Sequence, residues 1–569
     1  MKAFKQAIHR SRPVFQHVTA ANRNYCRQTR EDNIVKTSVP HVPLPNLSLD
    51  EYLLRKAGRW SDKTALECAE TGRHYTFGET QRYAERLSQA LCAKFGYRKG
   101  DTVAIMVPNV PEFMIVVLAT LRAGIIITTI NPIYTEDEVA RQLKDADVKA
   151  VITLATNYKT VENGLRQLRP NVRIPIITIK HQKTDTTPPG AIDFKELIDY
   201  TGPEVRLDSP SMEDLALLAY SSGTSGMPKG VQLIHRNISS NLCQLQHDLF
   251  RMTADTTQSH QDIVPIVAPV FHCYGMIPIL FNSFSEGCKS IMLPKYTPVT
   301  FLNMLEKYPC NIMQIVPPIT IMMTTNDAAK PHHVEQCRHI VTAAAPFAAS
   351  DAALFKKKYG QHMSLLQYYG LTETGPVTHA ARLDRPVIQG SCGYTLHLTE
   401  SRIVAVEDET KNLPANQDGH LLIRGEGIMK GYHNNPKATA EALDADGWLR
   451  TGDIGHYDEQ GAFYITDRIK ELIKVKGFQV APAELEALIR EHPDVTDAAV
   501  ISVPHQQNGE APKAFVVVRK DAKLRPEQVQ EYVKQKAAKY KQLTGGVEFV
   551  DSIPKNPSGK ILRRLLKQL

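Results

Sequence analysis

"YSSGTSGMPKGVQLIH", residues 220–235, places three Ser, one Thr, three Gly and one Lys within positions 220–230. The apolar run DLALLAY (214–220) precedes this loop, and the alternating run GVQLIH (230–235) follows it. The pattern predicts two strands joined by a loop of small residues. Such a loop gathers backbone N–H groups and hydroxyls with little steric bulk, and it therefore indicates a phosphate-binding site.

The candidate phosphate-binding residues are small or carry a donor group, and they are Ser221, Ser222, Gly223, Thr224, Ser225, Gly226 and Lys229. Their spacing is not that of a Walker loop, which has four residues between its first Gly and Gly-Lys. A strand rather than a helix is expected to follow the loop. Taken alone, the loop is equally well explained as a flexible hairpin connection.

Strand-like runs alternate with helix-like segments on both sides of this loop, for example at 102–107, 150–153, 175–179 and 311–316. Near residue 466 the chain becomes dense in charge, and a compact segment follows with a helix pattern at 482–492 and strand patterns at 498–503 and 514–518. Alternation of this kind predicts an α/β protein with largely parallel sheets.

We expect a large N-terminal domain of several subdomains with parallel-rich sheets, a hinge, and a small α+β C-terminal domain. The predicted division is 1–30 as a targeting segment, 31–465 as the large domain and 466–569 as the small domain.

The net charge of +8 lies mostly in the first thirty residues, which hold seven Lys and Arg and no acidic residue. The remaining chain is nearly neutral, and it shows no basic stripe with interleaved aromatic residues, so we expect no nucleic-acid partner. The basic segment has Phe4, Ile8 and Phe15 at helical spacing, which is typical of a mitochondrial transit peptide. The alternative is that this segment is a basic disordered tail and that the protein is cytoplasmic. The final Lys567-Gln568-Leu569 is not the peroxisomal signal Ser-Lys-Leu.

The apolar run 113–130 contains Arg122 and Gly124, so it predicts a buried helix followed by a buried strand, not a transmembrane segment. Contact with a membrane surface is left open. Nine Cys occur without a CxxC pair, which indicates neither a zinc site of that type nor a disulfide framework.

Further motifs follow the Gly-Ser-Thr loop in order: FHCYG (271–275), QYYGLTETG (367–375), GWLRTGD (447–453), DRIKELIKVKGFQV (467–480) and PKNPSGKILRR (554–564). Together they resemble the adenylate-forming superfamily of acyl-CoA synthetases, coumarate-CoA ligases, luciferases and peptide-synthetase adenylation domains. The resemblance covers about residues 50–565 and is strongest to the acyl-CoA synthetase branch.

This resemblance implies that a carboxylate attacks the α-phosphate of ATP to give an acyl-adenylate and pyrophosphate, after which the CoA thiol displaces AMP. It implies Mg²⁺ as cofactor and a carboxylic acid, ATP and CoA as partners. Thr372 would supply a hydroxyl to phosphate and Glu373 a carboxylate to Mg²⁺, with Tyr369 and Gly370 beside the nucleotide. A cap at the start of a helix is the alternative explanation of Thr372 and Glu373.

Asp453 would accept hydrogen bonds from two ribose hydroxyls, which an ionised carboxylate can do. Arg468 would make a second ribose or phosphate contact. His272 is expected to border the acyl carboxylate and the nucleotide, with a buried structural histidine as the alternative.

Lys560 matches the lysine that reaches across the domain interface to the substrate carboxylate and the α-phosphate. Lys470 matches the hinge position of the family. Lys474 and Gly477 belong to another face of the small domain, which the resemblance assigns to CoA.

The chain departs from the family pattern in TAAAPF (342–347), where Ala343 replaces a Gly and is expected to remove φ freedom beside the acyl pocket. FHCYGM is one residue shorter than its luciferase counterpart, which disfavours bioluminescence.

We therefore predict an AMP-forming acid–CoA ligase that acts on medium- to long-chain fatty acids. The alternatives are an aryl-CoA ligase of the coumarate type, a luciferase-like oxygenase, an adenylation domain that loads a separate carrier protein, and a non-catalytic acyl- or nucleotide-binding protein.

Overall fold

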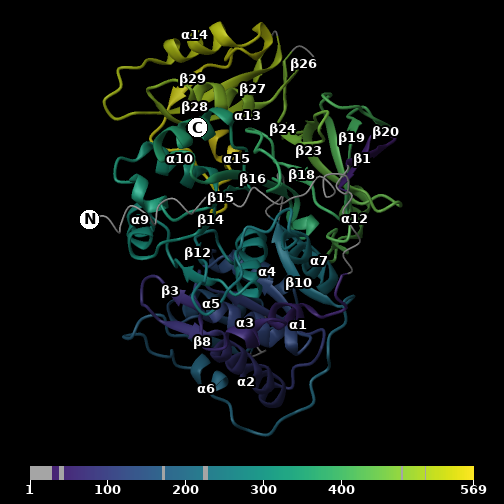
Figure 1. Ribbon diagram of the computed structural model, residues 1–569, viewed down its shortest axis with the longest axis vertical. Helices are drawn as coiled ribbons and strands as arrows, with labels where there is room; N and C mark the ends of the chain where they lie inside the picture. Colours follow the sequence, from purple (N-terminus) through teal and green to yellow (C-terminus); the bar gives the residue numbers. More distant parts are fainter. Residues whose placement is uncertain are drawn as a thin grey trace, which may run out of the picture.

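The computed structural model describes residues 28–37, 44–168, 174–221, 228–475, 478–505 and 508–568. Figure 1 shows a large N-terminal part with a smaller C-terminal part above it, coloured yellow. The predicted targeting segment lies outside the described residues except for residues 28–30, which belong to β1 (Gln28–Glu31).

The Gly-Ser-Thr stretch joins two strands of an eight-stranded sheet, as predicted. In order across the sheet the strands are β22 (Gly431–Tyr432), β11 (Lys229–Ile234), β10 (Leu215–Ser221), β6 (Ile126–Thr129), β5 (Thr102–Met106), β7 (Val148–Leu154), β8 (Ile176–Ile179) and β9 (Ile192–Asp193). Pairing from β10 to β9 is parallel, and β10 and β11 pair antiparallel with Ser221 opposite Lys229. Both ends of the loop therefore lie at the same end of the β10–β11 strand pair.

The helices between these strands make the crossovers that parallel pairing requires. They are α3 (Glu112–Arg122), α4 (Glu136–Asp145), α5 (Tyr158–Leu168) and α6 (Phe194–Ile198), whereas α2 (Phe77–Phe95) lies before β5, the first strand of this sheet along the chain. Helix α2 begins with a capping box, in which the Glu79 N–H donates to Thr76 at 3.1 Å and the Thr76 N–H donates to the Glu79 carboxylate at 2.9 Å. It ends at Gly96, whose φ is +70°.

The apolar run 113–130 forms the buried helix α3 and the buried strand β6, as predicted. No helix within the described ranges is long and apolar enough to span a membrane.

Two further sheets contribute to the same core. One has the order β12 (Ile263–Ile266), β13 (Lys289–Met292), β3 (Thr64–Cys68) and β4 (His74–Thr76); the other has the order β14 (Ile312–Ile315), β15 (His339–Thr342), β16 (Ser364–Gly370), β17 (Val377–Ala380) and β18 (Tyr394–Thr395). Their helical segments are α1 (Leu49–Leu54), α7 (His235–Leu245), the π-helix η4 (Gly275–Phe281), α8 (Asn282–Ser285), α9 (Pro298–Lys307), α10 (Pro317–Thr325), α11 (Ala349–Tyr359) and the short 3₁₀ helices η2 (Ala57–Trp60), η5 (Pro331–Val334) and η6 (Thr372–Thr374).

A seven-stranded sheet differs from the expectation of parallel-rich sheets, because all its pairs are antiparallel. Its strands are β1, β2 (Ile34–Thr37), β19 (Thr399–Ala405), β20 (Asp408–Asn412), β21 (Gly419–Gly425), β23 (Leu449–Tyr457) and β24 (Phe463–Arg468), and α12 (Pro436–Ala442) precedes β23. Hairpin connections join β1 to β2, β19 to β20 and β23 to β24, which explains the antiparallel pairing of these strands. In the first hairpin Asp32 and Asn33 have φ of +53° and +62°, as a tight two-residue turn requires.

The small C-terminal part has its own sheet and its own apolar core. Its strands are β25 (Ile473–Val475), β26 (Phe478–Val480), β27 (Val495–His505), β28 (Gly509–Val518) and β29 (Val547–Phe549), and its helices are α13 (Pro482–Arg490), α14 (Pro526–Lys536) and α15 (Arg563–Leu566). The helix predicted at 482–492 and the strands predicted at 498–503 and 514–518 are α13, β27 and β28. The chain thus has the predicted α/β architecture with a large and a small domain, while the numerical domain boundaries stay predictions.

Candidate active site

Three polar side chains meet where the β10–β11 hairpin lies beside η6. Ser221 at the end of β10 donates to Glu373 Oε1 at 3.2 Å, and the Tyr432 hydroxyl donates to the same oxygen at 3.0 Å. Lys229 opens β11, and its Nζ lies 4.8 Å from the centre of the Tyr432 ring. The structure therefore brings Ser221, Lys229 and Glu373 together as expected. The other loop residues of the prediction, Ser222 to Gly226, lie outside the described residues.

A second cluster forms around Asp453, which is only 2 % exposed. Its Oδ2 accepts the Tyr369 hydroxyl at 2.6 Å, and its Oδ1 lies 3.0 Å from Arg468 Nε. Asp453 on β23 faces Arg468 on β24 because the two strands pair in register at this point. Each carboxylate oxygen can accept more than one hydrogen bond, so Asp453 can still accept ribose hydroxyls.

Gly370 carries no side chain because the backbone packs closely at the end of β16. A Cβ at this position would lie 1.8 Å from the carbonyl oxygen of Pro376. This close approach fixes the turn that presents Thr372 and Glu373 from η6. The structure therefore gives Gly370 a backbone role beside the site.

Lys560 enters the site from the small domain. Burial, together with the Arg468 charge, lowers the pKa of Lys560 to about 8, although the Asp453 and Glu373 charges oppose this change. The Lys560 backbone N–H donates to Asn556 Oδ1 at 2.9 Å, and the Asn556 N–H donates back to the Lys560 carbonyl at 2.9 Å. A rigid turn therefore holds this ammonium group among the charges of the nucleotide site.

The turn that carries Lys560 packs directly on the large domain. A Cβ on Gly559 would lie 3.1 Å from Pro318 Cδ and 3.4 Å from Val316 Cβ, and the φ of Gly559 is +84°. A second cross-domain contact is the ion pair between Arg490 on α13 and Asp351 on α11, at 3.1 Å. The structure is thus the closed arrangement in which Lys560 faces the nucleotide site.

His272 is neutral in this environment. Burial lowers its pKa to about 4, with a further contribution from the Lys560 charge. Its Nδ1 accepts the Tyr274 N–H at 3.3 Å, which leaves Nε2 to carry the proton. His272 is therefore a hydrogen-bond donor, not a cation, at neutral pH.

Cys273 belongs to the FHCYG motif, and its thiol contacts Thr372 of η6. Burial, together with the Glu373 charge, raises the pKa of its thiol to about 12, against the opposing effect of a hydrogen bond with Thr372. The thiol stays protonated, so it is no nucleophile. The hydrogen bond between Cys273 and Thr372 instead links Thr372 to the segment that carries His272.

Of the predicted hinge and CoA residues, the structure describes Lys470 and Lys474. Lys470 is exposed in the connection between β24 and β25, and Lys474 is exposed on β25, where its backbone N–H donates to Glu510 Oε2 at 2.6 Å. Gly477 lies outside the described residues. In the closed arrangement, Lys474 is on a part of the small domain other than the Lys560 turn.

The expectation for Ala343 is wrong in one respect. Ala343 is buried and is not among the residues with positive φ, so the missing Gly removes no conformation that this position uses. The adjacent Ala344 has φ +72° instead. An alanine in this left-handed region carries strain of roughly 1–3 kcal/mol.

Tyr432 and His420 were not predicted from the sequence. Tyr432 reaches Glu373 because the two-residue strand β22 pairs with β11, which no local pattern reveals. His420 Nε2 accepts the Gly452 N–H at 3.0 Å, and its Nδ1 lies 3.1 Å from Glu409 Oε1. These contacts hold the backbone of Gly452, the residue that precedes Asp453, in place.

Comparison with known proteins identifies similar chains. The model described as "AMP-binding enzyme" matches residues 53–433, and "AMP-binding enzyme C-terminal domain" matches residues 484–560. The chain is 35 % identical over 564 residues to 4-coumarate–CoA ligase 1 of Arabidopsis thaliana, covering 98 % of each protein. It is 34 % identical to 4-coumarate:CoA ligase 1 of Petunia hybrida, covering 94 % of this chain and 96 % of that protein. Its fold resembles the ATP-bound structure of MatB from Rhodopseudomonas palustris, with a TM-score of 0.80, 27 % identity, and coverage of 92 % and 99 %.

Proposed function

Because the chain belongs to the AMP-binding enzyme family and is an AMP-forming acid–CoA ligase, we propose that its acid substrate is an arylpropenoic acid of the 4-coumarate type. The observation that carries this proposal is the similarity to 4-coumarate–CoA ligases along almost the whole chain. The preference for fatty acids expected from the sequence stays a prediction, and the experiment below compares both substrate classes.

In the first half-reaction, a carboxylate oxygen of the acid attacks the α-phosphorus of ATP. The bond from that phosphorus to the bridging oxygen of the β-phosphate breaks, and pyrophosphate leaves with the electron pair. Lys560 is proposed to offset the negative charge that develops on the α-phosphate, because its turn delivers an ammonium group beside Asp453 and Glu373. The docked turn also excludes water that would hydrolyse the adenylate.

Asp453 is proposed to bind the ribose, with Arg468 and Tyr369 holding its carboxylate in place. Neutral His272 is proposed to donate a hydrogen bond from Nε2 toward the acyl carboxylate. In the second half-reaction, the CoA thiolate attacks the acyl carbonyl carbon and AMP leaves. Lys474, which is exposed, and Gly477 are proposed to serve this step after the small domain has turned.

The Glu373 carboxylate fits Mg²⁺ because it is a hard oxygen ligand. Its Oε1 accepts from Ser221 and Tyr432, which orients the carboxylate. When bound, the ion would supply positive charge to the phosphate oxygens. Lys229, beside Tyr432, adds a positive charge of the chain itself.

The test is a panel of acids from C2 to C20 together with cinnamate and 4-coumarate, measured as CoA-dependent AMP formation. We expect 4-coumarate to give a kcat/KM at least about 10-fold above that of any straight-chain acid, which corresponds to about 1.4 kcal/mol of transition-state binding. A higher kcat/KM for a fatty acid would overturn the proposed substrate, while leaving the ligase reaction intact.

A further inference from the structure

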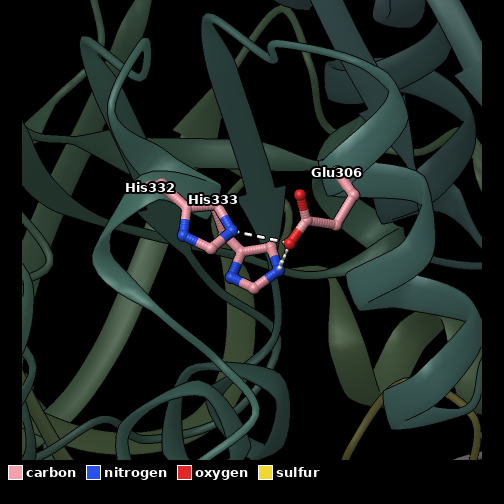
Figure 2. A group of neighbouring side chains, drawn as sticks. All are labelled: Glu306, His332 and His333. Carbon is pink, nitrogen blue, oxygen red and sulfur yellow. Dashed lines mark hydrogen bonds and ion pairs between the residues drawn. The ribbon is translucent and has the colours of Figure 1, made fainter.

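Three potential metal ligands converge at the surface of the large domain, outside the candidate active site. Glu306 lies near the C-terminal end of α9, and His332 and His333 lie in η5. Figure 2 shows both imidazole rings directed at the same carboxylate oxygen. His332 Nε2 is 2.6 Å and His333 Nε2 is 3.2 Å from Glu306 Oε1, and the three ligand atoms lie within 4.8 Å of one another.

The ligand chemistry favours Zn²⁺ over the Mg²⁺ of the nucleotide site. Two imidazole nitrogens and one carboxylate oxygen form a known ligand set for Zn²⁺, with the fourth position open to water. Mg²⁺ prefers oxygen ligands alone. The sequence contained no CxxC pair, and this site needs none, because its ligands come from two segments that the fold brings together.

The present distances are those of hydrogen bonds to the carboxylate. A Zn²⁺ ion with bonds of about 2.0–2.2 Å would require its ligands to move slightly apart. Glu306 and His332 are both exposed, so their side chains can make this adjustment without disturbing the core. His333 is only 5 % exposed and supplies a fixed point.

The backbone of Lys330 can support the required form of His333. His333 Nδ1 accepts the Lys330 N–H at 2.9 Å, which puts the proton on Nε2 toward Glu306, and Nδ1 also lies 3.1 Å from the Lys330 carbonyl oxygen. A His that binds metal through Nε2 must carry its proton on Nδ1, so metal binding requires the proton to move to Nδ1, where the Lys330 carbonyl can accept it in place of the bond from the Lys330 N–H. Such an outer hydrogen bond orients metal-binding histidines in other proteins.

We propose that Glu306, His332 and His333 form a binding site for a divalent transition-metal ion, Zn²⁺ foremost. The ion joins the end of α9 to the segment that leads into β15. Because it binds the folded arrangement, it stabilises this part of the large domain by mass action. It has no role in the acid–CoA ligase reaction.

The experiment titrates Zn²⁺ by calorimetry into untagged full-length protein without ATP, with Co²⁺ absorption as a second readout of ligand geometry. We expect one ion to bind at micromolar concentration. His332→Ala and Glu306→Gln should each weaken binding by at least about 10-fold, since loss even of an outer partner costs that much. Both residues are exposed, so the variants are expected to fold, which circular dichroism checks.

His74→Ala is the matched control, because His74 is an exposed histidine on β4. This variant should bind Zn²⁺ like the unchanged protein. The ligase activity of all three variants should be unchanged. Equal Zn²⁺ affinity in His332→Ala and the unchanged protein, or no binding to the unchanged protein, would overturn the proposed site.

Discussion

At the scale of single residues, Lys560 serves only one of the two half-reactions in our proposal. Lys560→Ala should slow acyl-adenylate formation by roughly 10²–10³-fold, the usual loss when one donor to a developing anion is removed. Thioester formation from preformed acyl-adenylate should be nearly unchanged, because no charge then develops on the phosphate that Lys560 faces. Rapid-quench measurement of both half-reactions gives the two rates.

Lys555→Ala is a suitable control, because Lys555 is paired with Asp497 at 2.6 Å within the small domain. It should change neither rate by more than about 3-fold. If Lys560→Ala slows both half-reactions equally, the assignment of Lys560 to acyl-adenylate formation alone is wrong.

The lowered pKa of Lys560 predicts how adenylation depends on pH. With a pKa of about 8, Lys560 is charged below pH 8 and loses its proton above it. The kcat/KM for ATP, which reports on the free enzyme, should therefore fall as the pH rises through about 8. In Lys560→Arg the guanidinium keeps its proton, so this alkaline decline should disappear even if the rate is lower. The same decline in both proteins would assign it to another group.

At the scale of strands, the contact between β21 and β23 positions the nucleotide site. His420 on β21 accepts the Gly452 N–H, and the Gly452 carbonyl accepts the Ile469 N–H at 2.9 Å. His420→Ala leaves the Gly452 N–H without its acceptor, which costs about 1–3 kcal/mol if the group stays buried. We expect a KM for ATP raised about 10-fold with a smaller change in kcat, together with a lower free energy of unfolding in urea.

A glutamine at this position keeps an acceptor, so His420→Gln should recover part of the ATP affinity. His456→Ala serves for comparison, since His456 lies on the neighbouring strand β23 and pairs with Asp418 at the surface. If His420 only supports the fold, His420→Ala should lower the free energy of unfolding and leave the ratio of the KM for ATP to kcat unchanged.

Local sequence patterns predicted the elements whose signal is contained in one segment. The buried strand β5 and the amphipathic helix α13 were readable from runs of apolar residues. The β1–β2 hairpin was not predicted, because its turn residues Asp32 and Asn33 stand in a Pro-rich segment and its partner strand is β19.

The residues of the candidate site also fall into two groups, those that a local motif reveals and those that only tertiary pairing reveals. Asp453 and Lys560 stand in distinctive motifs and were found, whereas Tyr432 acts only because β22 pairs with β11. The loss of φ freedom expected at Ala343 has no effect there, and the positive φ occurs at Ala344, since the backbone angle of one residue depends on packing that the sequence does not display. Motifs thus indicated the chemistry, and tertiary pairing supplied the residues that position it.

At the scale of the whole molecule, one ion pair connects the two domains at α11 and α13. Arg490 and Asp351 have side-chain exposures of only 13 % and 10 %, so their contact is shielded from water. Arg490→Ala should weaken docking of the small domain and lower the adenylation rate by about 10-fold, equivalent to about 1.4 kcal/mol. Thioester formation from preformed acyl-adenylate should not be slowed, because it uses the other orientation.

The ratio of the two half-reaction rates is the measurement. Lys513→Ala provides the control, because Lys513 pairs with Glu548 at 2.8 Å inside the small domain. The double variant Asp351→Ala with Arg490→Ala should recover part of the lost rate, since no buried charge is left unpaired. An unchanged ratio in Arg490→Ala would show that this pair does not bias the domain orientation.

The position of the β1–β2 hairpin in the chain also determines how early the sheet that contains it can be completed during synthesis. Thr37 on β2 donates to the carbonyl of Thr395, which lies 358 residues later in the chain. At a synthesis rate of roughly 5–20 residues per second, about 20–70 seconds pass between the emergence of these two residues from the ribosome. The β1–β2 hairpin therefore lacks its partner strand β19 while most of the large domain is made. The sheet that carries Asp453 can be completed only after its last strand, β24, has been made.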